Sequence, residues 1–299
     1  MDFTEEKERI ISFISSKLSE EDKDGFVIGL SGGIDSTVVA YLLKEAVGID
    51  KIFALIMPEL DSDPSSRKDA LMVAKNLRIR CKVLPITEIL WATGVYRDVP
   101  LWMIPSRILK EKKIKGIYKH YENVLGKPLF FSIKDRVDPK LYWFNRGKAY
   151  YSIKHRVRMT LLYFFAEKMN YLTAGCINLT EKLIGFYVRY GDDASDIAPI
   201  SHLYKTEVME FARFLNLPEK IIEKEPTPDL IPGITDEFSI GISYGDLDRI
   251  LKAFEEGKTP EEIEGVDKDM LNLIYDQYMW IKKQEKKPLH LERRVEDNG

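Results

Sequence analysis

A short glycine- and serine-rich stretch constrains this chain more than any other feature of its sequence. It follows an apolar run over residues 26–30 and precedes an apolar-periodic segment over residues 38–47, which predicts a strand, a tight turn and a helix start. Adjacent glycines let the backbone approach a ligand, and hydroxyls add donors beside the free N–H groups of a helix N-terminus. The stretch therefore predicts a phosphate-binding loop, made of Gly29, Leu30, Ser31, Gly32, Gly33, Ile34, Asp35, Ser36 and Thr37.

This loop differs from a Walker loop, because the Gly-x-x-x-x-Gly-Lys-Ser/Thr spacing and its lysine are absent. A carboxylate, Asp35, stands inside the predicted anion site instead. That placement is favourable if a divalent cation joins the carboxylate to phosphate oxygens. The simpler alternative is a serine-capped helix in which Asp35 favours the positive end of the helix dipole.

Composition sets limits on the class of protein. The chain has 299 residues, 44% of them hydrophobic, which is enough for one large α/β domain or two small ones. Its net charge of −3 favours no particular partner, and its charged N-terminus does not resemble a signal peptide. No apolar run approaches membrane-spanning length, so we expect a cytoplasmic protein with no membrane partner.

The order of the expected elements predicts an α/β fold. Strands are expected over 26–30, 51–57, 80–86 and 171–175, and helices over 5–18, 38–47, 65–77, 152–169, 180–187, 205–215, 244–256 and 268–283. Strands alternating with helices imply a parallel sheet with right-handed crossovers. Ligands bind such sheets beyond the carboxyl ends of the strands, where the predicted loop lies. Residues 225–235, rich in proline, are expected to form an irregular loop.

Residues 95–148 break this pattern. They contain 13 basic and five acidic residues with nine aromatics, a local net charge of +8. Basic residues interleaved with aromatics are typical of surfaces that bind nucleic acid. A solvated face over a small apolar subcore explains the composition equally well.

Further polar residues could serve a phosphate-binding enzyme. Glu181 follows the fourth expected strand and is a candidate second magnesium ligand, although a surface helix position is the simpler reading. Lys205 is a candidate cation for the β and γ phosphates, or simply a solvated lysine. Residues 189–199 place an arginine and three acids around a glycine turn, which predicts either a ligand site or an ordinary loop.

Several motifs resemble known families. The Ser31 to Ser36 stretch resembles the Ser-Gly-Gly-x-Asp-Ser signature of PP-loop ATP pyrophosphatases. Residues 154–159, 190–196, 203–205, 225–230, 235–237 and 241–244 resemble, in order and spacing, those of ammonia-dependent NAD synthetases. The resemblance covers about two thirds of the chain. It implies a Rossmann-like three-layer fold of the adenine nucleotide alpha hydrolase type, built as one domain over residues 1–299. Within that domain, residues 95–148 would be an insertion and residues 244–285 a helical C-terminal part.

The resemblance also implies roles for individual residues. ATP would bind the loop from Gly29 to Ser36 together with Cys176, Lys205 and Thr227, and Mg²⁺ would bind Asp35 and Glu181. Cys176 stands where the family has threonine. The dinucleotide substrate would contact Arg156, Arg189 and Asp196. Asp35, Lys205 and Asp192 are the expected catalytic residues, and the family forms homodimers with the substrate near the interface.

The implied reaction is the ATP-dependent amidation of nicotinic acid adenine dinucleotide to NAD through an acyl-adenylate, with release of pyrophosphate and AMP. No glutaminase domain is recognisable in the sequence, so we expect free ammonia or a partner that delivers it. Two alternatives remain. One is a PP-loop paralogue that adenylates another carboxylate or an RNA base, motivated by residues 95–148 and the altered acceptor positions. The other is a nucleotide-binding module without turnover.

Overall fold

A four-stranded parallel sheet forms the centre of the molecule in the computed structural model, which describes residues 1–132, 142–227 and 231–284. The strand order is β3-β2-β1-β4, and β1 pairs on its two sides with β2 and β4. The strands are β1 (Gly25–Gly29), β2 (Ile52–Ile56), β3 (Arg80–Val83) and β4 (Tyr171–Ala174). The prediction of a parallel sheet is confirmed.

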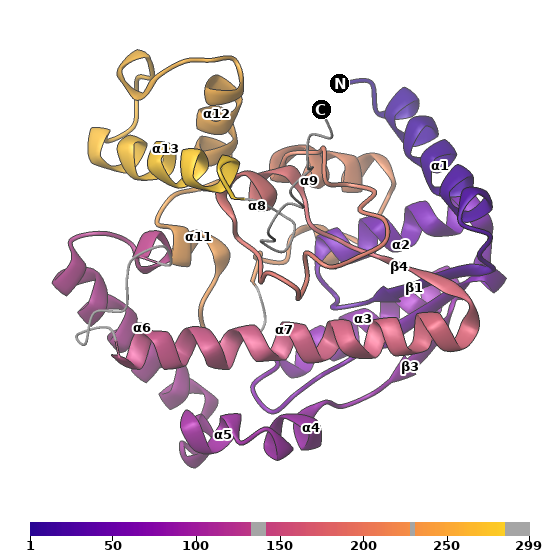
Figure 1. The fold of residues 1–299 in the computed structure, drawn as a ribbon, viewed down its shortest axis with the longest axis horizontal. Coiled ribbons are helices and arrows are strands. Elements are labelled where there is room, and N and C mark those ends of the chain that lie inside the picture. The colour runs from indigo at the N-terminus through magenta and orange to yellow at the C-terminus, as the bar shows by residue number, and fades with distance from the viewer. Residues whose placement is uncertain (133–141, 228–230, 285–299) are drawn as a thin grey trace, which may run out of the picture.

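Helices cover both faces of the sheet and give three layers (Figure 1). Alternate strand residues supply the two cores: Phe26 and Ile28 pack on one face, and Val27 packs on the other. One outer layer contains α1 (Phe3–Glu20), α2 (Ile34–Val47), α3 (Pro64–Leu77) and α9 (Lys205–Phe214). The other contains α4 (Thr87–Ala92) and α7 (Tyr142–Met169). The expected three-layer α/β fold is therefore confirmed.

A third apolar core joins the C-terminal helices to Phe130 and Phe131 of η3 (Leu129–Ser132). The helices that contribute are α8 (Leu179–Ile184), α11 (Asp236–Ile240), α12 (Tyr244–Glu255) and α13 (Lys268–Lys282). The last two nearly match the helices expected there, and residue 285 lies outside the described part. Three short elements connect the longer ones: η1 (Ile49–Lys51) precedes β2, α10 (Glu219–Ile222) follows α9, and η5 (Pro260–Glu262) lies between α12 and α13.

Residues 95–148 are more regular than the sequence pattern indicated. They contain α5 (Val95–Asp98), η2 (Leu101–Met103) and α6 (Arg107–Leu125), and α7 begins at Tyr142 rather than at residue 152. On α6 only Ile114 and Tyr121 are buried, although Ile117, Tyr118 and Leu125 continue the same apolar spacing, so the sequence held a helical pattern that the basic composition of the segment obscured. Residues 133–141 of this segment lie outside the described part.

Two predicted elements extended too far toward the C-terminus. β3 ends at Val83 rather than at residue 86, although Leu84 N and Ile86 N still donate to Ile56 O at 2.8 Å and to Pro58 O at 3.0 Å. α8 ends at Ile184 because Gly185 adopts a left-handed conformation, with φ +73°. The described residues of the loop expected over 225–235 are irregular, and residues 228–230 are not described.

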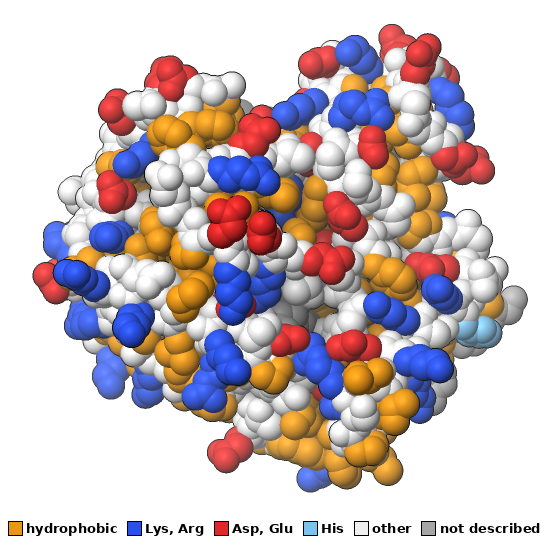
Figure 2. Space-filling view, turned by 180° about the vertical axis from the view of Figure 1, so that it is seen from behind, with side chains coloured by type: hydrophobic (Ala, Val, Ile, Leu, Met, Phe, Trp, Pro, Cys, Tyr) orange, Lys and Arg blue, Asp and Glu red, His pale blue; other side chains and the backbone are white. Residues whose placement is uncertain are grey.

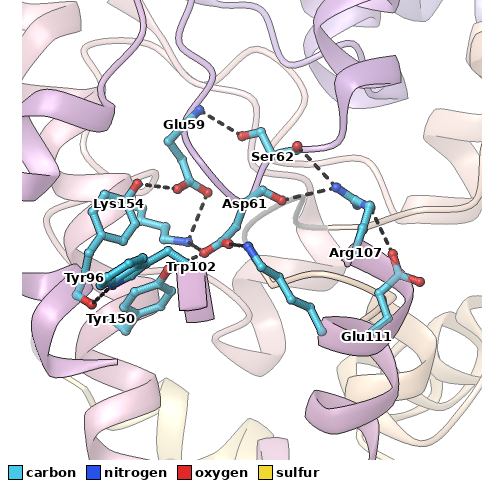
Figure 3. A network of polar contacts seen from close by, with 10 residues as sticks. Glu59, Asp61, Ser62, Tyr96, Trp102, Arg107, Glu111, Tyr150 and Lys154 are labelled. Atoms are coloured by element: carbon cyan, nitrogen blue, oxygen red, sulfur yellow. Dashed lines mark hydrogen bonds and ion pairs between the residues drawn. The ribbon is translucent and has the colours of Figure 1, made fainter. Parts of the chain in front are cut away.

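A buried ionic network joins α7 to the loop that follows β2 (Figure 3). Lys154 of α7 donates to Glu59 Oε1 at 3.0 Å and to Asp61 Oδ2 at 3.1 Å, and none of the three side chains is exposed. Tyr96 donates to the second oxygen of Glu59 at 2.6 Å, and Tyr150 donates to Asp61. Every charge in the network is paired, which a buried ion cluster requires.

The same network reaches α6. Lys110 donates to Asp61 Oδ1 at 3.1 Å, and Arg107 pairs with Asp63 and Glu111, each at 2.9 Å. These pairs neutralise part of the positive charge noted over residues 95–148. On the face of the molecule shown in Figure 2, acidic and basic side chains are interspersed, in keeping with the small net charge. Within the described part of the chain, no helix combines the length and the apolar character that crossing a membrane would need.

Candidate active site

The glycine- and serine-rich loop lies between β1 and α2, as predicted. Gly33 is the N-cap of α2 and has no side chain to bond the first N–H groups, so the helix is not capped by serine. Ser36 instead donates to Gly33 O at 3.2 Å and accepts from Ser31 N at 3.3 Å. The N-terminal N–H groups of α2 thus have no side-chain cap, as an anion site needs. The serine-cap alternative is wrong.

Gly32 is required where the loop meets α3. Its φ is +79°, and a Cβ there would lie 2.4 Å from Ser66 O and 2.8 Å from Ala70 N. Both contacts are shorter than side chains tolerate, so the loop packs directly on the backbone of α3. This close packing fixes where the loop lies relative to the carboxyl ends of the strands.

Asp35 and Lys205 form an ion pair at the start of α2. Lys205 Nζ lies 2.5 Å from Asp35 Oδ2, and Asn178 donates to Asp35 Oδ1 at 3.1 Å. The Lys205 side chain is only 2% exposed, and Thr180 accepts from its backbone N–H at 2.9 Å. Burial opposes the charge, but the surrounding carboxylates hold the pKa of Lys205 above its usual value. Two residues 170 positions apart therefore meet as a fixed charge pair.

Two further carboxylates surround this pair. Burial and the charge of Asp35 raise the pKa of Glu181 well above its usual value. Burial raises the pKa of Asp236 to about 6, and its Oδ2 accepts from Tyr244 at 2.9 Å while its Oδ1 is buried without a hydrogen bond. Three carboxylates around one ammonium group leave an excess of negative charge.

The donor set fits a magnesium ion that arrives with a nucleotide. Within the described ranges, no group of three or more His, Cys, Asp and Glu side chains is placed to hold a metal ion alone. Mg²⁺ usually takes one or two carboxylates and completes its shell with phosphate oxygens and water. Asp35 and Glu181, whose ionised forms repel each other, supply that number of carboxylates.

A pocket of about 280 Å³ opens above these groups, between the loop and α7. Many of the residues expected to bind ATP and magnesium line it: Gly29, Leu30, Ser31, Gly33, Ile34, Asp35, Ser36, Cys176, Glu181, Lys205 and Thr227. Asp192 lines it as well. Burial raises the pKa of the Cys176 thiol, which disfavours the reactive thiolate.

The three residues expected to contact a dinucleotide are not among the described residues that line this pocket. Arg156 donates to Arg189 O at 3.2 Å, beside the pocket. Asp196 accepts from the backbone N–H of Thr173 at 2.7 Å and from its hydroxyl at 2.8 Å, which ties the following loop to β4. Their substrate roles remain predictions.

The pocket wall also contains residues for which no role was predicted from the sequence. Tyr151, His155 and Arg158 come from α7, Ser66 and Arg67 from α3, and Lys224 and Asp236 from the C-terminal half. His155 and Asp236 stand inside the motifs quoted above, which was the available signal. Lys224 and Ser66 reach the loop from other elements, and no local pattern indicates them.

Asp192 makes the stability of the fold depend on pH. Burial raises its pKa to about 7 from 3.8, although it accepts from Val188 N at 2.7 Å. The folded state therefore keeps a proton that the unfolded chain releases, and Asp192 reduces stability as pH rises from about 4 to about 7. Asp192→Asn should raise Tm relative to the wild-type protein more at pH 8 than at pH 5. Thermal denaturation at both pH values measures this, and an equal Tm difference at the two would contradict it.

The fold and this site define a class: an α/β protein whose parallel sheet presents an uncapped helix N-terminus, an acid–lysine pair and a pocket for a phosphorylated ligand. The model of the NAD synthase family matches residues 6–98 and 103–288. The NH3-dependent NAD(+) synthetase of Coprothermobacter proteolyticus is 47% identical over 290 residues, which is 97% of this chain and 98% of that protein. The chain belongs to the NAD synthase family.

Solved structures of similar sequence share the fold of this chain. The NH3-dependent NAD synthetase from Campylobacter jejuni is 28% identical, with a TM-score of 0.68 over 98% of this chain and all of that one. The NMN synthetase from Francisella tularensis is 26% identical, also with a TM-score of 0.68, over 99% of this chain and all of that one. The resemblance noted in the sequence is thereby confirmed, and so is the fold that it implied.

Proposed function

We propose that this chain is an ammonia-dependent NAD synthetase, a ligase that forms a C–N bond at the expense of ATP. It amidates nicotinic acid adenine dinucleotide with ammonia and releases AMP and pyrophosphate. The observation that carries the proposal is the 47% identity, over nearly all of both chains, to a protein named as such a synthetase. The arrangement of Asp35 and Lys205 beside the N-terminus of α2 supports it.

The chemistry has two steps. A carboxylate oxygen of the substrate attacks the α phosphorus of ATP, and the bond to the β phosphate breaks to release pyrophosphate. Ammonia then attacks the acyl carbon, AMP leaves with the oxygen that came from the carboxylate, and the nitrogen loses a proton. Neither step needs a protein nucleophile, so the protein's work is to position reactants and stabilise charge.

Specific residues are suited to that work. The N–H groups at the start of α2 would bind phosphate oxygens, and Lys205 would neutralise charge on the departing pyrophosphate. Asp35 and Glu181 would hold Mg²⁺, which supplies Lewis-acid stabilisation of the phosphates when bound. Cys176 and Thr227 line the same pocket and would contact ATP. Asp192 also lines the pocket, and we assign it the role of accepting the proton that the attacking ammonia loses.

We propose that the dinucleotide binds against Arg156, Arg189 and Asp196, beside the pocket and near a homodimer interface, with its carboxylate reaching the α phosphate of ATP in the pocket. Six of the large apolar side chains exposed by two fifths or more lie within residues 102–124, which supports such an interface. They are Trp102, Met103, Ile108, Leu109, Ile117 and Val124.

Disrupting this apolar surface should give a monomer. Ile108 is 76% exposed and Leu109 54%, so replacing both with glutamate removes apolar area without touching the core. Sedimentation velocity should show a dimer for the wild-type protein and a monomer for the double variant. Phe13→Glu, on the distant helix α1, is the control and should remain dimeric. A double variant that stays dimeric would place the interface elsewhere.

The direct test supplies ATP, Mg²⁺ and ammonium with different acceptors. We expect NAD and stoichiometric AMP and pyrophosphate with nicotinic acid adenine dinucleotide, and little pyrophosphate without an acceptor. The likeness to a structure titled NMN synthetase makes the carboxylate precursor of NMN the second candidate acceptor. Faster turnover of that mononucleotide would favour the second candidate, and no turnover of either would contradict both.

A further inference from the structure

The peptide unit between Gly32 and Gly33 is held at both ends. Its carbonyl, Gly32 O, accepts from Lys224 Nζ at 3.3 Å. Its N–H, on Gly33, donates to Ser31 Oγ at 3.1 Å. The first of these bonds comes from a residue 192 positions away. The orientation of this peptide therefore depends on a segment outside the loop itself.

Orientation matters here because both residues are glycines. Without a Cβ, a glycine peptide can rotate into conformations that other residues avoid, so its plane is easily reversed. A reversed peptide would turn a carbonyl oxygen, with its negative partial charge, toward the site where phosphate is proposed to bind. Holding the carbonyl of Gly32 on a cation prevents that reversal.

Lys224 is itself fixed by α3. Its ammonium group also lies 3.1 Å from both Ser66 Oγ and Asp69 Oδ2. Asp69 is 1% exposed, and although burial opposes its charge, Lys220 and Lys224 hold its pKa below the usual value. The buried carboxylate is thus an anchored anion that sets where Lys224 lies.

We propose that Lys224 is a positioning residue that fixes the Gly32–Gly33 peptide for phosphate binding, with Asp69 as its anchor. Lys224 begins the segment that contains Thr227 and lines the pocket, and Asp236 N donates to Pro226 O at 3.1 Å. Because Lys224 bonds Gly32 O, a shift of the segment that begins at Lys224 would also change the geometry of the phosphate-binding loop. The inference rests on the proposed ATP site.

The chain offers a matched control. Lys220 shares Asp69 with Lys224 but is 61% exposed and, within the described part of the chain, makes no hydrogen bond to the loop, whereas Lys224 is 20% exposed. Lys224→Met and Lys220→Met therefore remove the same charge from the same carboxylate. We expect the Kd for Mg·ATP to rise about tenfold in Lys224→Met, the size of one lost charge-assisted hydrogen bond, and less than about twofold in Lys220→Met.

A second readout separates positioning from direct contact with phosphate. Hydrogen exchange of the loop amides over residues 29–37, measured without nucleotide, should be faster in Lys224→Met and unchanged in Lys220→Met. Equal effects of the two variants in both measurements would overturn the inference. So would weaker ATP binding with unchanged exchange, because Lys224 would then act only through its charge. Wild-type protein that binds no ATP would contradict the proposed function, while the nucleotide-free exchange would still test the role of Lys224.

Discussion

Asp35→Asn should lower ATP-dependent pyrophosphate release by roughly 10³-fold. The substitution removes the charge that pairs with Lys205 and that would hold Mg²⁺ on the phosphates, while it keeps the shape of the side chain. The hydrogen bond from Asn178 shows that this carboxylate has a defined place in the site. Pyrophosphate release from ATP, Mg²⁺, ammonium and nicotinic acid adenine dinucleotide measures the effect.

The control for this variant is Asp50→Asn, which removes an exposed carboxylate in η1, the short helix directly before β2. It should retain wild-type activity. Thermal denaturation of both variants shows whether each is folded. A folded Asp35→Asn protein whose activity stays within tenfold of the wild type would contradict the magnesium assignment.

The largest loss of stability is expected from Lys154→Met. Lys154 is fully buried with two carboxylates, so its removal leaves Glu59 without a cation and Asp61 with Lys110 alone among the described residues. Breaking such a cluster from one side costs about 3–5 kcal/mol of the free energy of unfolding. Urea denaturation followed by circular dichroism measures the difference from the wild-type protein.

Neutralising the carboxylates tests the cause of that loss. Lys154→Met combined with Glu59→Gln and Asp61→Asn should recover part of the stability, because the buried charges are then gone. Lys110→Met is a milder comparison, since Lys110 is 12% exposed and donates to Asp61 from α6. We expect it to cost about 1 kcal/mol. A loss below about 1 kcal/mol for Lys154→Met would show that the network contributes little.

The central features of the fold could be predicted because their signals are local. The apolar run, the adjacent glycines and the following periodic segment lie side by side in the sequence and gave β1, the loop and α2. The alternation of strands and helices was equally visible. In contrast, α6 was missed because lysines dominate its composition, although Ile114, Ile117, Tyr118 and Tyr121 recur at helical spacing.

The site was less accessible to local reasoning. Asp35 stood out as a carboxylate in an anion site, but its pairing with Lys205 joins distant parts of the chain and was not predicted, since Lys205 was expected to contact phosphates instead. Lys224 and Asp69 have no sequence signal, because their role depends on a contact with a backbone carbonyl. The positions of Arg156 and Asp196 depend on a substrate and a partner subunit, and their roles stay predictions.

The basic segment over residues 95–148 acquires a structural explanation where it is described. Arg107 and Lys110 pair with acids of the loop after β2, and Arg146 pairs with Asp98. These contacts tie α6 to the loop that leads into α3, whose Ser66 and Arg67 line the pocket, and they tie the first turns of α7 to α5. The mixture of charges and aromatics thus includes a packed, ion-paired interface within the chain.

The transfer of oxygen from the substrate carboxylate to AMP tests the central claim most directly. Nicotinic acid adenine dinucleotide labelled with ¹⁸O in its carboxylate is converted with ATP, Mg²⁺ and ammonium, and the AMP is analysed by mass spectrometry. If the carboxylate attacks the α phosphorus, each AMP carries one ¹⁸O atom and the NAD amide retains the other. Unlabelled AMP accompanying NAD, with the label in pyrophosphate or phosphate, would contradict the acyl-adenylate and the role given to this site.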